Sequence, residues 1–269
     1  MPEIITFGNQ KGGVGKTTTV VNLADGLGRE GYRVLALDAD PQGNCTSILL
    51  KEIGLREQFS LVKALEAPVD EGDLSSMACS TSNDNVDVIP NTIRCMLWER
   101  TAANTPDSIL GFLRLARHDK GLDKYDFVLI DTPPNIGAMV NNALMLSDYA
   151  IIPIPTSDQF ALDGLATFLR ILQNIRSQNG KLKLMGVLLT KYDSRANVYV
   201  KNRERIINFF SSKGIHVFKT TIRINVDIDR AHMKRKTIFE FDPAKYGAKD
   251  HTALAKEIAQ IVQEEKARR

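Results

Sequence analysis

The hydrophobic and polar positions along the chain alternate short apolar runs with longer amphipathic stretches. Short apolar runs bounded by polar or turn residues predict strands. The predicted strands are Ile4–Phe7, Tyr32–Leu37, Val86–Ile89, Lys124–Ile130, Ala150–Ile154 and Leu184–Leu189. Several of these runs are almost continuously apolar, as in Tyr32–Leu37 (YRVLAL). Such strands are typical of a parallel sheet that is covered on both faces.

Amphipathic stretches between these runs have apolar residues at helical spacing. The predicted helices are Thr17–Arg29, Asp107–Arg117, Ile136–Leu146, Phe160–Ser177, Val198–Phe210 and Ala248–Glu265. Strands separated by helices imply right-handed crossovers. We therefore expect an α/β fold with a mostly parallel twisted sheet and helices on both faces, built as one domain over residues 1–269. The segment Ala67–Asp87 is rich in Ser, Asp and Asn, which favours a surface loop or variable insertion.

Composition and charge place the chain among ordinary globular proteins. Of its 269 residues, 43% are hydrophobic and 25% are charged, with a formal net charge of +3. No apolar run approaches the roughly 20 residues of a bilayer crossing, and no export signal is visible at the start. The three cysteines form no Cys-x-x-Cys pair, which favours reduced thiols in a cytoplasmic protein over a zinc or disulfide framework.

The segment Gly8–Thr18 joins the first predicted strand to the first predicted helix. Its glycines let backbone N–H groups curve around phosphate oxygens, and the following helix offers its free N–H groups and positive dipole end. In such a loop Lys16 would reach the β- and γ-phosphates, and the Thr17 hydroxyl would ligate Mg²⁺. The strand–loop–helix context therefore predicts a nucleotide phosphate site.

This loop departs from the general P-loop pattern, because Gln10 stands at the first glycine position and Lys11 follows it. The resulting KGGVGKTT resembles the deviant Walker A box of the ParA/MinD group of ATPases. The resemblance implies that ATP, with Mg²⁺, binds in this loop, and that Lys11 is a signature lysine that crosses a dimer interface to the partner's phosphates. The nucleotide-binding residues implied here are Lys11, Gly12, Gly13, Val14, Gly15, Lys16, Thr17 and Thr18.

Three further segments extend the resemblance. Asp38–Asn44 (DADPQGN) resembles the ParA branch, which implies Asp38 near the Mg²⁺ shell and Asp40 near the attacking water. Tyr125–Pro134 resembles the Walker B strand and switch II, which implies that Asp131, at the carboxyl end of its strand, holds a water bound to Mg²⁺. Thr190 and Asp193 resemble a T-x-x-D segment that lies near the nucleotide base.

The C-terminal third is basic. Between Arg195 and Lys245 there are 12 Lys or Arg residues and 5 Asp or Glu residues. Basic clusters bind phosphate backbones without reading sequence, and ParA ATPases bind nucleoid DNA in this way. Arg223 stands where the family has proline, and Ile224 stands where it has arginine. The candidate DNA-binding residues are Arg195, Lys201, Arg203, Arg223, Lys234 and Arg235.

The function that the resemblance implies is an ATP-driven switch. An ATP-bound homodimer would bind double-stranded DNA nonspecifically on the nucleoid, and a ParB-like adaptor would stimulate a weak ATPase through Lys11, Lys16 and Asp40. The cargo would be a plasmid, a chromosome origin or a protein assembly. With only three residues before Ile4, the chain resembles the short ParA proteins that lack a helix-turn-helix extension.

Three alternatives are weighed against this interpretation. A MinD/FlhG-like membrane or cell-pole role needs a membrane-binding C-terminal helix, but the apolar stripe at Leu254, Ile258, Ile261 and Val262 is narrow and favours docking onto the protein body. A metabolic P-loop synthetase or kinase needs an acceptor pocket that the sequence does not reveal. A nitrogenase iron-protein role needs cluster cysteines, and no cysteine stands at a plausible bridging position.

Overall fold

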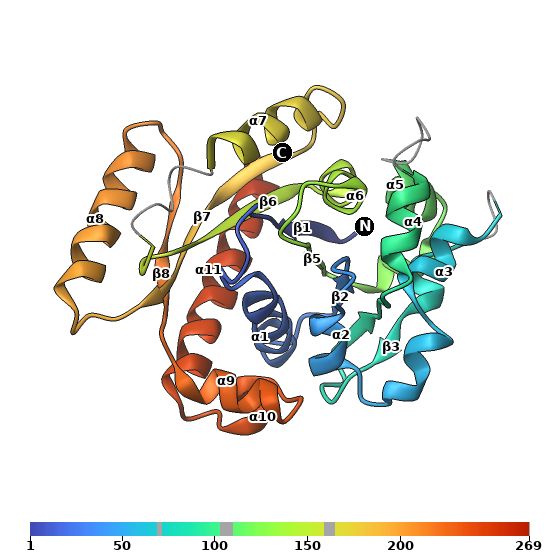
Figure 1. Ribbon diagram of the computed structural model, residues 1–269, viewed down its shortest axis with the longest axis horizontal. Coiled ribbons are helices and arrows are strands. Elements are labelled where there is room, and N and C mark those ends of the chain that lie inside the picture. Colours follow the sequence, from blue (N-terminus) through green and yellow to red (C-terminus); the bar gives the residue numbers. More distant parts are fainter. Residues whose placement is uncertain (69–71, 103–109, 159–164, 269) are drawn as a thin grey trace.

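The computed structural model describes residues 1–68, 72–102, 110–158 and 165–268 (Figure 1). Over these residues the chain forms an eight-stranded sheet in the order β3-β4-β2-β5-β1-β6-β7-β8. All strand pairs in this sheet are parallel except β3 with β4. The strands are β1 (Glu3–Phe7), β2 (Val34–Asp38), β3 (Cys79–Ser80), β4 (Val86–Ile89), β5 (Phe127–Asp131), β6 (Tyr149–Pro155), β7 (Lys183–Tyr192) and β8 (Val217–Arg223).

Helices cover both faces of the sheet (Figure 1). They are α1 (Lys16–Arg29), α2 (Asn44–Leu49), α3 (Leu61–Glu66), α4 (Cys95–Ala102), α5 (Gly111–Ala116), α6 (Ala138–Leu146), α7 (Leu165–Arg176), α8 (Asn197–Ser211), α9 (Val226–Met233), α10 (Ile238–Phe241) and α11 (Tyr246–Arg268). Short 3-10 helices lie at Ile53–Glu57, Ser75–Met77 and Lys120–Lys124. The predicted fold class is confirmed.

Alternation along the central strands produces two separate hydrophobic layers, because successive side chains of a strand point to opposite faces. Ile5 and Phe7 of β1 pack with α1 and α11 on one face. Ile4 packs on the other face with α3, α5 and α6. A third cluster, under α7 and α8, covers the β6–β7 end of the sheet.

The C-terminal helix docks as predicted. Leu254 and Ile258 are fully buried, Val262 is nearly so, and Ile261 is partly buried against the same cluster. These side chains pack on α1 and β8, so the apolar stripe forms part of the protein's own core. Among the described residues, no helix combines the length and apolar character that a bilayer crossing requires.

Some predicted boundaries are wrong. The predicted loop Ala67–Asp87 contains a 3-10 helix, the edge strand β3 and the start of β4, with Leu74 and Cys79 buried in the core; its residues 69–71 lie outside the described residues. Parts of the predicted helices Asp107–Arg117 and Phe160–Ser177 also lie outside them. The sequence patterns did not predict β3, β8, α2, α3, α4, α9 or α10, which are short or mixed in polarity.

Candidate active site

The glycine loop follows β1 at the carboxyl edge of the sheet, where ligands of open α/β folds bind. Gly13 and Gly15 have φ values of 72° and 94°, a left-handed conformation that side chains with a Cβ rarely adopt. Gly15 is also the N-cap of α1, and no side chain caps that end. The first N–H groups of α1 are therefore free to bind an anion.

The two lysines of this loop face different surroundings. Lys16 is only 6% exposed, and its Nζ donates hydrogen bonds to the carbonyl oxygens of Asn9 (3.1 Å) and Lys11 (3.3 Å). Burial lowers the pKa of Lys16, although the charges of Asp131 and Asp40 act in the opposite direction. The side chain of Lys11 is 54% exposed and pairs with Asp158, in the segment after β6. One lysine is thus held inside the site, while the other lies at its rim.

Asp131 is a completely buried carboxylate whose neighbours include the Thr17 hydroxyl and the ammonium of Lys16. It ends β5 and pairs in register with Asp38 of β2. Burial raises the pKa of Asp131 well above its usual range, the charges of Asp38 and Asp40 add to this, and a hydrogen bond from Thr17 and the charge of Lys16 oppose it. A buried carboxylate next to other carboxylates is costly unless a cation compensates its charge. The donor set of Asp131 and the nearby Thr17 hydroxyl fits Mg²⁺, which prefers oxygen ligands.

Asp38 is bound differently, although it is equally buried. Its Oδ2 accepts hydrogen bonds from the N–H (2.8 Å) and the hydroxyl (2.6 Å) of Thr46, and its Oδ1 accepts one from the N–H of Asp40 (3.1 Å). Burial raises the pKa of Asp38 to about 6 despite these donors. Asp38 therefore holds α2 and the start of the following turn in place. Sequence reasoning missed Thr46, because its role depends on a contact between α2 and the end of β2.

Asp40 begins a tight turn beside these groups and is 7% exposed. Its Oδ1 accepts from the N–H of Gln42 (2.9 Å), and its carbonyl accepts from the N–H of Gly43 (2.9 Å). Its charge acts on both Lys16 and Asp131, which places the three groups in one electrostatic cluster. The structure thus brings together the residues predicted to act on the phosphates, the cation and the attacking water.

Thr190 and Asp193, both predicted near the nucleotide base, have different partners in the structure. Thr190 is buried, and its hydroxyl donates to the carbonyl of Val14 (2.8 Å), so it supports the glycine loop. Asp193 accepts from the N–H (3.0 Å), Nε (2.9 Å) and Nη2 (2.8 Å) of Arg195, and these bonds lower the pKa of Asp193 to about 2. Asp193 therefore binds Arg195, and it does not line a cavity that lies beside the start of α1.

That cavity, of about 310 Å³, lies beside the start of α1 and is walled by the ends of β7 and β8 and by α9. Thr190 forms part of its wall. Lys191 lies at its rim with φ of 52°, an uncommon conformation for a residue with a side chain. Its lining includes Gly15, Thr18, Lys191, Arg223, Ile224 and Asn225.

The candidate DNA-binding residues are unequally available. Arg223 donates to Asp250 of α11 through Nε, Nη2 and its backbone N–H, and its guanidinium lies 4.3 Å from the centre of the Tyr246 ring. Burial opposes the rise in pKa of Arg223 that Asp250 causes. Arg223 is thus committed to the protein's own α11.

The remaining candidates lie nearer the surface. Arg195 is 88% exposed despite its contact with Asp193. Arg203 lies over the Tyr192 ring (5.7 Å), and Lys234 lies over the Phe241 ring (5.2 Å). Lys201 lines a cavity of about 550 Å³ between α8 and the segment 156–158, together with Arg205. Arg235 has a left-handed φ of 54° just after α9.

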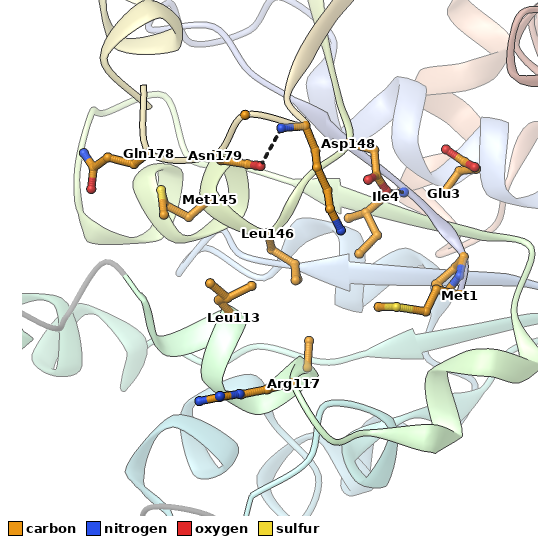
Figure 2. Close-up of a pocket in the computed structure, with 14 residues that line it drawn as sticks. Met1, Glu3, Ile4, Leu113, Arg117, Met145, Leu146, Asp148, Gln178 and Asn179 are labelled. Carbon is orange, nitrogen blue, oxygen red and sulfur yellow. Dashed lines mark hydrogen bonds between the residues drawn. The ribbon is translucent and has the colours of Figure 1, made fainter. Parts of the chain in front are cut away.

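A separate cavity of about 460 Å³ opens at the opposite edge of the sheet (Figure 2). The side chains of Leu113, Met145 and Leu146 line it, with Arg117 at one side. Because it borders the amino ends of β1, β6 and β7, the length of a strand, on the order of 15 Å, separates it from the glycine loop. It therefore offers no acceptor pocket for the phosphate site.

Comparison with known proteins assigns the family. The family model described as "AAA domain" matches residues 2–184. The sporulation initiation inhibitor protein Soj of Bacillus subtilis (strain 168) is 39% identical over 261 residues, covering 96% of this chain and 99% of that protein. The chain belongs to the Soj/ParA family of P-loop ATPases. The family assignment predicted from the glycine loop is thereby confirmed.

Other relatives extend this comparison. The chromosome-partitioning ATPase Soj of Thermus thermophilus is 36% identical, covering 97% of this chain and 96% of that protein. The crystal structure of cobyrinic acid a,c-diamide synthase from Mycobacterium smegmatis with bound ADP and magnesium has a TM-score of 0.79 and 25% identity, covering 98% of this chain and 96% of that one. The coverage of 96% and 97% by the two Soj proteins means that the similarity to this family spans nearly the whole chain.

Proposed function

We propose that this chain is an ATP-driven dimerisation switch that binds double-stranded DNA nonspecifically and positions a cargo together with a ParB-like adaptor. The chain is an ATPase by family and by its glycine loop, and it uses ATP with Mg²⁺. The observation that carries the proposal is the contrast between Lys16 and Asp131, buried at one site, and Lys11, exposed at its rim.

The residues divide the work of hydrolysis among them. Lys16 and the N–H groups at the start of α1 hold the β- and γ-phosphates. Thr17 and Asp131 would hold Mg²⁺, which would neutralise phosphate charge when it is bound, while Asp38 fixes the adjoining turn. Asp40, at the head of that turn, orients the attacking water. The cavity beside Gly15 receives the base.

Lys11 supports the dimer part of the proposal. Its exposed ammonium is paired with Asp158 rather than turned into its own site. A second subunit placed face to face would offer its phosphates to this lysine, and a cation there stabilises the charge that develops during phosphoryl transfer. Intrinsic hydrolysis should therefore be slow until dimer, DNA and adaptor come together.

The basic surface supports the DNA part. Arg195, Lys201 and Arg203 lie on or beside α8, and Lys234 and Arg235 directly follow α9. Arg223 would support this DNA-binding surface by anchoring the end of β8 to α11 through Asp250, and it would not bind a phosphate directly. A dimer would join two such surfaces, and the chain would then associate with the nucleoid in the cytoplasm.

A single pair of measurements tests the switch. The variant Asp40→Ala should bind ATP, form a dimer in size-exclusion chromatography with light scattering, and fail to hydrolyse ATP. Lys11→Ala is the matched control, because it should bind ATP and remain a monomer. A monomeric Asp40→Ala protein saturated with ATP would contradict the proposal.

The metabolic synthetase hypothesis makes a different prediction. A structurally similar protein carries a synthase name, and that role needs an acceptor pocket next to the phosphates. The 460 Å³ cavity lies at the wrong edge of the sheet for this. ATP hydrolysis stimulated by duplex DNA and an adaptor supports the switch; stimulation by a small acceptor alone, with no ATP-dependent DNA binding, supports the synthetase.

A further inference from the structure

Arg56 occupies an unusual place beside the turn that carries Asp40. It belongs to the 3-10 helix Ile53–Glu57 and is partly buried. Its Nε donates a hydrogen bond to the carbonyl of Asn91 (2.5 Å). Its Nη2 lies directly against Gly43, where a Cβ would meet it at 1.7 Å. The guanidinium thus fills the space that any side chain at position 43 would need.

Gly43 closes the Asp40 turn. Its N–H donates to the carbonyl of Asp40 (2.9 Å), and its φ of 64° is left-handed. It is also the N-cap of α2, the helix that carries Thr46. A shift of Gly43 would therefore move both Asp40 and the donors that hold Asp38.

Asn91, the other partner of Arg56, is connected to Asp38 from the loop after β4. It follows the carboxyl end of β4, and its N–H donates to the hydroxyl oxygen of Thr46 (2.9 Å). That hydroxyl donates in turn to Asp38. Arg56 therefore lies between the loop after β2 and the loop after β4, and it contacts the backbone of both.

We propose that Arg56 is a positioning residue for ATP hydrolysis, which clamps the Asp40 turn against the loop that follows β4. This inference rests on the function proposed above, in which Asp40 orients the water. A planar guanidinium suits the role, because it can lie flat on the Gly43 backbone while Nε binds a carbonyl. A lysine at this position could keep the positive charge and one hydrogen bond, but its compact ammonium could not cover the Gly43 backbone as a planar guanidinium does.

The test is steady-state phosphate release by the full-length chain with Mg²⁺–ATP. Arg56→Ala should lower kcat by about tenfold and leave KM within about twofold, because the phosphates bind to Lys16 and α1 while the water is misplaced. Arg56→Lys should recover part of the rate. Millimolar ethylguanidinium should restore activity to Arg56→Ala, which a general loss of stability would not allow.

The control is Arg94→Ala. Arg94 pairs with Glu66 on the surface, with 50% of its side chain exposed, so this variant should keep the wild-type rate. Circular dichroism melting should first establish that each variant is folded. A folded Arg56→Ala protein with wild-type kcat, or with a raised KM and unchanged kcat, would overturn the inference.

Asp40→Ala, measured in parallel, separates the two proposals. If it hydrolyses ATP at the wild-type rate, the proposed function of Asp40 is wrong. If Asp40→Ala is inactive while Arg56→Ala is as active as wild type, only the inference about Arg56 is wrong.

Discussion

The phosphate edge of the sheet and the basic C-terminal third both concentrate charge, but the protein treats that charge in opposite ways. At the phosphate edge, Asp131 is completely buried beside Asp38, and Lys16 is almost completely covered. In the basic third, Arg195 binds Asp193, Arg223 binds Asp250, and Arg230 binds Asp227.

The buried charges at the phosphate edge are arranged to bind a ligand. The arginines of the basic third are instead paired with carboxylates of the protein itself. A buried carboxylate beside other carboxylates costs free energy, which a bound cation would offset. A surface arginine that is bound to a carboxylate has part of its hydrogen-bonding capacity occupied. Asp193 and Asp250 lie just outside Arg195–Lys245, so the charge count over that window overstates the free basic groups.

The largest expected effect lies at the phosphate edge. Lys16→Ala should weaken ATP binding by at least about 100-fold, because it removes a buried cation aimed at the phosphates. Isothermal titration calorimetry with Mg²⁺–ATP measures this. Lys11→Ala is the matched change in the same loop and should bind ATP normally. Equal losses of ATP affinity in the two variants would show that the buried Lys16 and the exposed Lys11 do not differ in their roles in binding.

The next effect concerns acid stability. His251 of α11 is fully buried, and burial lowers its pKa to about 4 from the ordinary value of 6.5. The unfolded chain therefore binds a proton that the folded chain rejects, so stability is lost as the pH falls from 6.5 to about 4. His251→Phe should remove about 2–3 kcal/mol of this loss.

Urea unfolding at pH 7 and pH 4.5 measures the difference between wild type and His251→Phe. Comparing the two proteins cancels the contribution of Asp38, whose raised pKa of about 6 makes stability fall as the pH rises in the same range. Parallel pH profiles for the two proteins would show that His251 titrates normally in the folded state.

A smaller effect is expected in the basic third. Arg195→Glu should weaken ATP-dependent DNA binding about three- to tenfold, with a shallower salt dependence and little change in ATP affinity. The effect is modest because Asp193 already binds this arginine. Lys120→Glu, the same charge change in the 3-10 helix Lys120–Lys124, serves as control. Identical losses in both variants would reflect net charge alone.

The smallest effect concerns the pair of Lys11 with Asp158. Asp158→Asn should favour the ATP-bound dimer about two- to fivefold, because it releases Lys11 from a partly exposed ion pair of modest strength. Analytical ultracentrifugation with a non-hydrolysable ATP analogue measures the dimer constant. An unchanged or weaker dimer would mean that the pair does not restrain Lys11.

Local sequence determined most of the fold and the centre of the site. Strand β1, the glycine loop and α1 are consecutive, so their geometry follows from glycine conformation and hydrophobic spacing over Glu3–Arg29. Asp131 was predictable because it ends a continuous apolar strand. Short or mixed-polarity elements such as β8 were not, because their stability comes from neighbours such as α11.

The sequence by itself therefore determined where the candidate triphosphate site lies, since that site is built from one continuous segment and two strand ends. Only the tertiary structure decided which charges remain available there and elsewhere. Arg56 with Gly43, Lys11 with Asp158, and Arg223 with Asp250 are separated by 13, 147 and 27 positions in the chain. The physical reason is that such pairs form only when folding packs separate elements against one another, and no local spacing in the sequence predicts that contact.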